Sequence, residues 1–363
     1  MPGSLSGAVV TLADVAAAAG VSVPTVSKVV NSKGDVAPAT RDRVERALVD
    51  AGYTRPASRR QRATGFIDLV FDYFCRPWAT EIIAGVEEVT RSQDYRLVVT
   101  TAHGDDQEER WLTRLAQSGT DGVILGLTDL SPRHRKRLMA MQVPMVIIDP
   151  VGQPDPKIPS IGASNWAGAL QATDHLVELG HSRIGAITGP PSMLCSRARL
   201  DGYRAALDRA GIELDSSLVA EGTFHFDAAL AAASKMLSLG EPPSAIFASS
   251  DVQAMGVYEA ARQVGLRIPD DLSVVGFDDL PVACWVPPPL TTVRQPFVEM
   301  ASLAVRVLLD PEFAVRHPRL ELATSLVVRA STGPPRSVRR QAPVPIRERR
   351  PGRGRAKVGT RVG

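Results

Sequence analysis

The stretch TLADVAAAAGVSVPTVSKVVN, residues 11–31, decides the organisation of this chain. Thr11 and Asp14 have the spacing of a capping box, apolar residues follow at helical spacing, and Gly20 provides a C-terminal stop. Ser22 can then cap a second helix. The pattern predicts two short helices joined by a tight turn, which is the arrangement of a helix-turn-helix.

A third helix is expected in TRDRVERALVDAGY, residues 40–53, so that three short helices enclose one small core. The outward face of the second helix carries small and polar residues, namely Val23, Thr25, Ser27, Lys28 and Asn31. Such a face fits the major groove, where its polar groups can reach base edges and phosphates. We predict a DNA-binding domain over residues 9–55, although a three-helix surface unit without a partner would have the same composition.

Charge is divided unevenly along the chain. Residues 1–55 carry a net charge of +1 and residues 56–64 one of +3, whereas residues 65–335 carry −10 and residues 336–363 carry +9. The acidic part would repel DNA, so any contact with nucleic acid must come from the ends. We interpret residues 56–64 as a basic hinge linker and residues 336–363 as a disordered tail, because both lack the apolar periodicity of a core.

From Phe66 onward, short β-rich runs alternate with helical patterns. The runs FIDLVF, YRLVVTT, GVILGL and PMVIID precede a proline-rich break, VGQPDPKIP, and the runs RIGAIT, AIFASS and LSVVGFDD follow it. This rhythm is typical of parallel sheets with crossover helices. We predict that residues 65–335 form two parallel α/β lobes that follow each other along the chain. A ligand would bind in the cleft between them, at the carboxyl ends of the strands.

Several classes of protein are disfavoured. No apolar run approaches the roughly 20 residues of a membrane span. The N-terminus lacks a basic leader, so we expect no signal peptide and a cytoplasmic, nucleoid-associated protein. The three cysteines, Cys75, Cys195 and Cys284, are far apart and read as reduced thiols. Because the sequence contains no nucleophile–base constellation, phosphate loop or metal-ligand spacing, we predict no catalytic residues, cofactor or metal.

The opening motif continues with V-x-P-x-T-R-x-R-V and AGY, and together they closely resemble the lactose-repressor and purine-repressor family of bacterial regulators. The resemblance extends through LGHSRIGAITGP, SRARLDGYRAAL, ASSDVQAMGVYEAARQVGLRIPDDLSVVGFDDL and PPLTTVRQPF, and so covers about residues 9–332. It implies a homodimer on two-fold symmetric, double-stranded operator DNA. It also implies a core like that of periplasmic sugar-binding proteins and a small-molecule effector, for which a sugar is the expected class.

The resemblance assigns roles in DNA binding to residues of the motif. Val23 and Pro24 match the pair that determines specificity, and Thr11 and Ser22 can offer phosphate contacts at helix N-termini. Neither Val23 nor Pro24 has a side-chain hydrogen-bonding group, so we expect apolar contact with a thymine methyl group there. The positions that contact bases and phosphates in the family correspond to Thr25, Ser27, Lys28 and Asn31.

The linker PASRRQRAT departs from the family pattern, in which a leucine wedges into the minor groove. Arg62 stands where that leucine belongs. We hypothesise that Arg59, Arg60 and Arg62 replace wedging with electrostatic contact in the groove. The alternative is a solvated basic linker that only tethers the two parts.

Effector contacts are also carried over from the family. Arg199 and Asp278 match its effector-binding arginine and aspartate and form the firmest pair. The other candidates are Asp72 and Trp78 near the first strand, Phe224 after EGT, and Ser250 with Asp251. Phe224 could instead fill the core, and Asp72 could cap a helix. Ser250 stands where many relatives have Asn or Thr, so a ligand hydroxyl could be met through water there.

We therefore expect a transcriptional regulator, most simply a repressor, whose operator affinity changes allosterically when the effector binds. Two alternatives belong to other classes: a periplasmic-type carbohydrate-binding protein without DNA function, and an enzyme on a two-lobed α/β fold.

Overall fold

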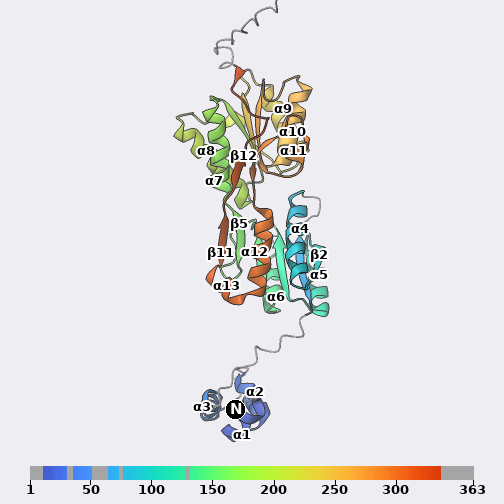
Figure 1. The fold of residues 1–363 in the computed structure, drawn as a ribbon, viewed down its shortest axis with the longest axis vertical. Helices are drawn as coiled ribbons and strands as arrows, with labels where there is room; N and C mark the ends of the chain where they lie inside the picture. The colour runs from blue at the N-terminus through green and yellow to red at the C-terminus, as the bar shows by residue number, and fades with distance from the viewer. Residues whose placement is uncertain (1–10, 31–35, 51–63, 73–76, 127–130, 337–363) are drawn as a thin grey trace, which may run out of the picture. The chain divides into compact units, whose positions relative to one another are not determined.

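The computed structural model describes residues 11–30, 36–50, 64–72, 77–126 and 131–336 (Figure 1). The chain divides into two compact units, residues 1–64 and residues 65–363. Three predicted parts lie wholly or partly outside the described residues: the tail except for Arg336, the linker except for Thr64, and residues 9–10, 31–35 and 51–55 of the DNA-binding domain.

Three short helices pack around a small core in the first unit: α1 (Leu12–Ala19), α2 (Val23–Val30) and α3 (Pro38–Asp50). Thr11 and Asp14 form the predicted capping box, and Gly20 adopts the left-handed conformation that ends α1. The buried side chains come from all three helices: Val15, Ala16, Ala19, Val26, Val29, Val44 and Ala47. The axes of α1 and α2 differ by 100°, which is the angle of a helix-turn-helix.

No single helix among the described residues is long and apolar enough to cross a membrane. The helices α1 and α2 reach the required length and composition only when they are counted together across their bend.

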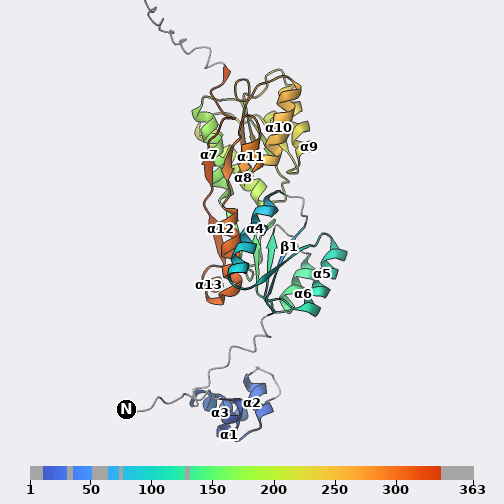
Figure 2. The same cartoon turned by 45° about the vertical axis from the view of Figure 1, so that its right-hand side comes forward.

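The first lobe of the second unit is built on a six-stranded sheet in the order β11-β5-β4-β3-β1-β2, in which every pairing is parallel. Helices α4 and α12 cover one face, whereas α5 and α6 lie together on the other (Figure 2). The elements are β1 (Phe66–Phe71), α4 (Pro77–Ser92), β2 (Arg96–Thr101), α5 (Asp105–Ser118), β3 (Gly122–Gly126), α6 (Pro132–Ala140), β4 (Met145–Ile148), β5 (Ser160–Ala163), α12 (Phe297–Leu309), α13 (Pro311–Arg316) and β11 (Arg319–Leu322).

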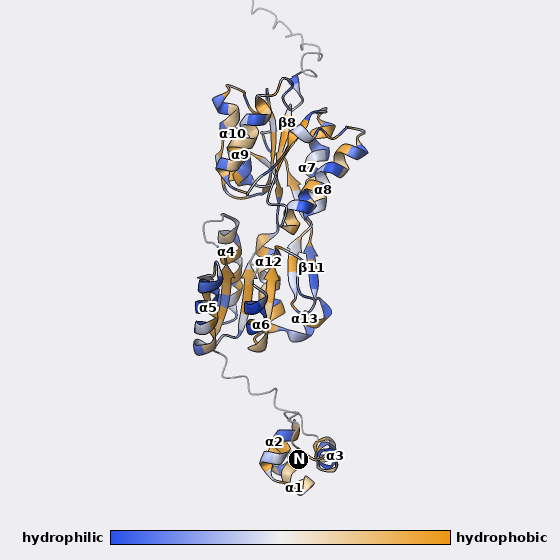
Figure 3. Ribbon diagram, turned by 180° about the vertical axis from the view of Figure 1, so that it is seen from behind, coloured by the Kyte–Doolittle hydropathy of each residue, from blue (hydrophilic) through white to orange (hydrophobic). Residues whose placement is uncertain are grey.

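The second lobe repeats this plan with the sheet order β12-β10-β9-β8-β6-β7, in which only β12 is antiparallel to its neighbour. Helices α7 and α8 cover one face, and α9 and α10 cover the other. The strands at the centre of both sheets are predominantly hydrophobic (Figure 3). The elements are α7 (Asn165–Glu178), β6 (Ile184–Thr188), α8 (Leu194–Arg209), β7 (Val219–Glu221), α9 (Phe226–Leu237), β8 (Ala245–Ala248), α10 (Asp251–Gln263), β9 (Ser273–Asp278), α11 (Val282–Trp285), β10 (Thr291–Arg294) and β12 (Ser325–Val327).

The lobes do not simply follow each other, which corrects the sequence-based expectation. Strand β5 lies beyond the proline-rich break but joins the first sheet, and α12, α13 and β11 return to the first lobe near the end of the chain (Figure 1). The chain therefore passes between the lobes three times. Two of these crossings are joined by hydrogen bonds, because the Ser164 amide donates to the Leu322 carbonyl at 2.8 Å and the Thr324 amide donates to Ser164 Oγ at 3.0 Å.

The contact between α7 and α8 generates a prediction. A Cβ atom on Gly202 of α8 would lie 2.3 Å from the Trp166 carbonyl oxygen of α7. Because overpacking a close contact forces the backbone to shift, Gly202→Ala should lower the free energy of unfolding by about 1–3 kcal/mol. Thermal denaturation of the purified protein measures the effect. The matched control is Gly240→Ala, whose added methyl group would meet nothing within 4 Å; equal melting temperatures for the two variants would contradict the close-packing argument.

Candidate functional site

The exposed surface of α2 is the first candidate site. Val23 is 43% exposed, and Ser22, Pro24 and Lys28 are also exposed. The hydroxyl groups of Ser22 and Thr25 lie 2.8 Å apart, and the Thr25 amide donates to the Ser22 carbonyl at 2.9 Å. Val23, Pro24 and Lys28 are thus exposed on α2, whose opposite side packs into the small core through Val26 and Val29.

The structure shows the surroundings of several predicted DNA-binding residues. The Thr11 hydroxyl donates to the Asp14 carboxylate at 2.7 Å, so its proton is engaged within the capping box. The same hydrogen bonds lower the pKa of the Asp14 carboxyl group. Ser27 is half-buried beside the exposed Lys28. The remaining predicted contacts, Asn31, Arg59 and Arg62, lie outside the described residues.

The second candidate site is a cavity of about 150 Å³ between the two lobes of the second unit. Both lobes and the second chain crossing contribute to it. The lining residues are Pro77, Trp78, Ile82, Ile148, Asp149, Phe297 and Met300 from the first lobe, Gln295 from the crossing, and Met193, Cys195, Arg199, Phe224, His225, Ser250, Val252, Asp278 and Leu280 from the second lobe.

Arg199 is the buried cation of this cavity, with only 3% of its surface exposed. Its Nε donates to Asn165 Oδ1 at 2.8 Å, and its Nη1 donates to the Ser249 carbonyl at 2.5 Å. The guanidinium carbon lies 3.8 Å from the centre of the Phe277 ring. Hydrogen bonding and stacking together hold the planar group in one orientation, as an arginine that recognises a polar ligand requires.

Asp278 ends β9 beside this arginine, with 3.7 Å between its Oδ1 and Arg199 Nη1. Burial raises its pKa to about 6, although the attraction of Arg199 opposes this shift. Gln295 Nε2 donates to Asp278 Oδ1 at 2.7 Å. The other atom of that amide, Gln295 Oε1, is buried and accepts no hydrogen bond from the described residues. It is a free acceptor for a hydroxyl or N–H group of a ligand.

Asp149 is a cavity residue that the sequence analysis missed. It follows β4 directly, and burial raises the pKa of its carboxyl group while Arg199 attracts its charged form. The only signal in the sequence was its place at the carboxyl end of a strand, the same signal that singled out Asp72. The backbone at Asp149, Phe224 and Asp278 is left-handed, with φ values of 50°, 62° and 120°. Such strain is retained where the surrounding structure enforces it, most often at functional sites.

Aromatic and small side chains complete the walls. Trp78 packs edge-on against Phe71, with 5.6 Å between the ring centres. The Phe224 ring lies 5.8 Å from the Arg199 guanidinium, and Gly189 leaves room for it, since a Cβ there would be 2.1 Å from Phe224 Cζ. Ser250 lines the cavity, but its hydroxyl also caps α10 by accepting from the Gln253 amide at 3.2 Å.

Two predicted effector residues, Asp72 and Asp251, are not among the residues that line the cavity. The Asp251 carboxylate is fully buried and accepts from the Leu280 amide at 2.7 Å and from Thr292 Oγ1 at 2.5 Å. It therefore ties α10 to the segments that flank the site. Asp72 directly follows β1 and is not among the lining residues. The sequence pattern could not separate these carboxylates from Asp149, because each of the three stands shortly after a strand, either directly behind it or at the start of the next helix.

Comparison with known families identifies both parts of the chain. Residues 11–56 match the model of "Bacterial regulatory proteins, lacI family", and residues 173–332 match that of a periplasmic binding protein-like domain. The match over residues 11–56 decides against the alternative of a carbohydrate-binding protein without DNA function.

Individual proteins resemble nearly the whole chain. The HTH-type transcriptional repressor CytR of Escherichia coli (strain K12) is 35% identical over 304 residues, which cover 83% of this chain and 89% of that protein. Two solved structures have the same fold. A complex of the transcriptional regulator CelR with cellobiose has a TM-score of 0.69 at 36% identity, and the lac repressor dimer bound to operator and the anti-inducer ONPF has 0.66 at 29%. Each covers 89% of this chain and 99% of its own.

A repressor that is 35% identical over more than four fifths of the chain, together with the matched helix-turn-helix, establishes the relationship. The chain belongs to the lacI family of bacterial regulatory proteins.

Proposed function

We propose that this protein is a transcriptional repressor that binds a two-fold symmetric operator as a homodimer and changes its affinity when a small carbohydrate binds between the lobes. The observation that carries the proposal is the buried Arg199–Asp278 pair in a cavity lined by both lobes. Such a protein would act in the cytoplasm, in association with the nucleoid.

The chemistry of the cavity supports a carbohydrate. Arg199, Asp149 and Asp278 offer charged partners for hydroxyl groups, and Gln295 Oε1 offers a further acceptor. Trp78 and Phe224 offer apolar faces on which the C–H side of a sugar ring can pack. The cellobiose complex of the CelR relative supports the same ligand class.

The three chain crossings support an allosteric mechanism. A ligand that contacts both lobes favours the arrangement in which they close on it, and the crossings are the segments that would absorb this motion. The linker enters the second unit at β1 of the first lobe, so movement of this lobe would be transmitted to the two linkers of a dimer. A coupling free energy of about 1–3 kcal/mol would change operator affinity roughly 5- to 150-fold.

Operator choice should depend on Val23 and Pro24. Because their side chains make apolar contacts only, replacing both with hydrogen-bonding residues, as in Val23→Tyr with Pro24→Gln, should select a different operator sequence. Binding-site selection from random DNA measures this. Ala18→Ser, an exposed change on α1, is the control that should return the wild-type site. A double variant that also returned the wild-type site would contradict the assignment.

The effector response should depend on Arg199. Arg199→Ala removes the cation and leaves Asp278 unpaired, so the effector should no longer change operator affinity. Trp78→Ala tests the same cavity from the other lobe without disturbing the buried pair and should weaken effector binding. Arg204→Ala, an exposed change on the same helix α8, is the control. Operator titrations with and without a panel of mono- and disaccharides measure the response, and a full response in both cavity variants would refute the proposal.

Asp278 should make stability depend on pH. Its pKa lies near 6 in the folded protein, against the ordinary value of 3.8 expected in the unfolded chain. The folded state therefore holds the proton more tightly, and its stability falls as the pH rises from about 4 to about 6. Asp278→Asn removes this pH dependence, so the stability of the variant relative to the wild type should rise by up to about 3 kcal/mol between about pH 4 and about pH 7. Denaturant unfolding of both proteins across this range measures the difference, which would stay constant if the carboxyl group were not buried in this way.

A further inference from the structure

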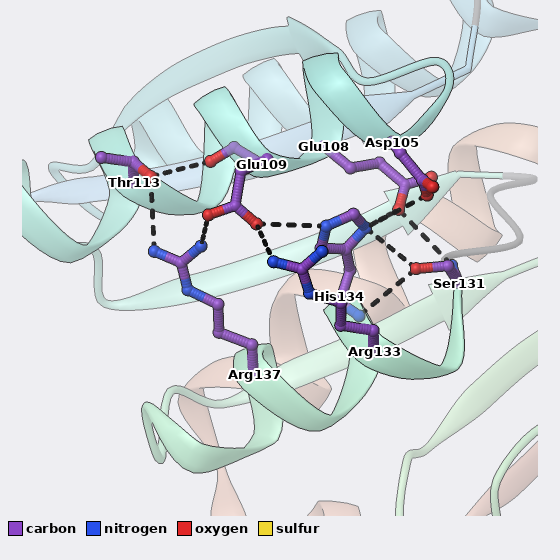
Figure 4. Close-up of polar contacts among 8 residues, drawn as sticks. All are labelled: Asp105, Glu108, Glu109, Thr113, Ser131, Arg133, His134 and Arg137. Carbon is purple, nitrogen blue, oxygen red and sulfur yellow. Dashed lines mark hydrogen bonds and ion pairs between the residues drawn. The ribbon is translucent and has the colours of Figure 1, made fainter.

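A cluster of metal-ligating side chains lies outside the cavity, between α5 and α6 on one face of the first sheet (Figure 4). Asp105 and Glu108 stand one turn apart on α5, and His134 faces them from α6. One potential ligand atom from each of these residues lies within 4.8 Å of the others. His134 is 1% exposed and Glu108 is 6% exposed. The proposed operator and effector binding uses none of the three.

The surroundings of the His134 ring are unusual because both nitrogens face carboxylates. Nδ1 lies 2.5 Å from Glu108 Oε2 and 3.8 Å from Asp105 Oδ1, and Nε2 lies 3.2 Å from Glu109 Oε2. A neutral imidazole carries only one N–H group. In that form one ring nitrogen turns its lone pair toward a carboxylate, and a cation bound at that nitrogen would relieve the repulsion.

Glu109 is held in place from outside the cluster. Arg137 donates to Glu109 Oε1, and Arg133 Nη2 lies 3.7 Å from Glu109 Oε2. These contacts lower the pKa of Glu109, chiefly through the hydrogen bond from Arg137. A carboxylate that accepts from Nε2 fixes the ring orientation and leaves Nδ1 as the ligating atom, as partners of metal-bound histidines do.

We propose that Asp105, Glu108 and His134 bind a divalent transition-metal ion, with Zn²⁺ as the best-suited probe. One imidazole nitrogen and two carboxylate oxygens form a ligand set that suits zinc, and a three-residue set leaves a position for water. Ser131 Oγ, 2.9 Å from His134 Nδ1, is placed to hydrogen-bond that water. The bound ion would join α5 to α6.

Small movements would convert the cluster into the metal-bound form. Ligands about 2.1 Å from a tetrahedral ion lie about 3.4 Å apart, so Glu108 must turn away from Nδ1 by about one ångström and Asp105 must approach slightly. Asp105 can do this because 83% of its side chain is exposed, which also gives the ion a path from solvent. With Glu109 Oε2 beside Nε2, the other ring nitrogen, Nδ1, is placed to offer its lone pair to the ion.

Calorimetric titration of the full-length, chelator-treated protein with ZnCl₂ tests the proposal. We expect one Zn²⁺ per chain and a raised melting temperature, because an ion that binds the folded state stabilises it. X-ray absorption should show one imidazole nitrogen with the remaining ligands oxygen. A sulfur ligand would assign the binding to the cysteines and overturn the proposal, as would the absence of saturable binding.

Variants locate the ion. Asp105→Asn changes an exposed ligand without disturbing the fold and should weaken Zn²⁺ binding at least about tenfold. Glu108→Gln should do the same from the buried side. Asp106→Asn makes the same change of charge one residue along α5 and is the matched control, and His317→Gln removes a histidine elsewhere in the first lobe. Unchanged affinity in Asp105→Asn and Glu108→Gln, or an equal loss in either control, would overturn the assignment.

Discussion

The buried guanidinium of Arg199 is the interaction on which the interlobe site depends. A cation with 3% of its surface exposed is stable only when hydrogen bonds and opposite charges surround it. Asn165, the Ser249 carbonyl and Asp278 supply these partners from three different elements of the second lobe. The contacts that stabilise the arginine therefore also fix the positions of the groups around the cavity.

The carboxylates of the cavity show the cost of this arrangement. Burial raises the pKa of both Asp149 and Asp278, and the backbone at both positions is left-handed. Neither feature favours the fold in itself. Both keep polar groups directed into a space between the lobes, where a ligand can satisfy them. Backbone strain and desolvation are thus concentrated in the cavity, where hydrogen bonds to a bound ligand can offset their energetic cost.

The path of the chain between the lobes couples their movements. Three crossings connect them, and hydrogen bonds between Ser164, Leu322 and Thr324 join two of these segments. Movement of one lobe relative to the other therefore bends all three segments together, unlike the independent motion of two domains joined by a single flexible linker. The sequence rhythm suggested consecutive lobes because β5 and β11 have four residues each, too few to mark which sheet they join.

The sequence by itself determined the local structure. The cap at Thr11, the stop at Gly20 and the alternation of strands and helices are set by residues close together in the chain. The positions of Trp78 at the start of α4 and of Asp278 at the end of β9 are set in the same way. Only the tertiary structure decided which carboxylates share a site. Asp149 enters the cavity while Asp251 turns to Thr292, and His134 meets Glu108 across two helices. These outcomes depend on contacts between distant segments, whose geometry no local pattern encodes.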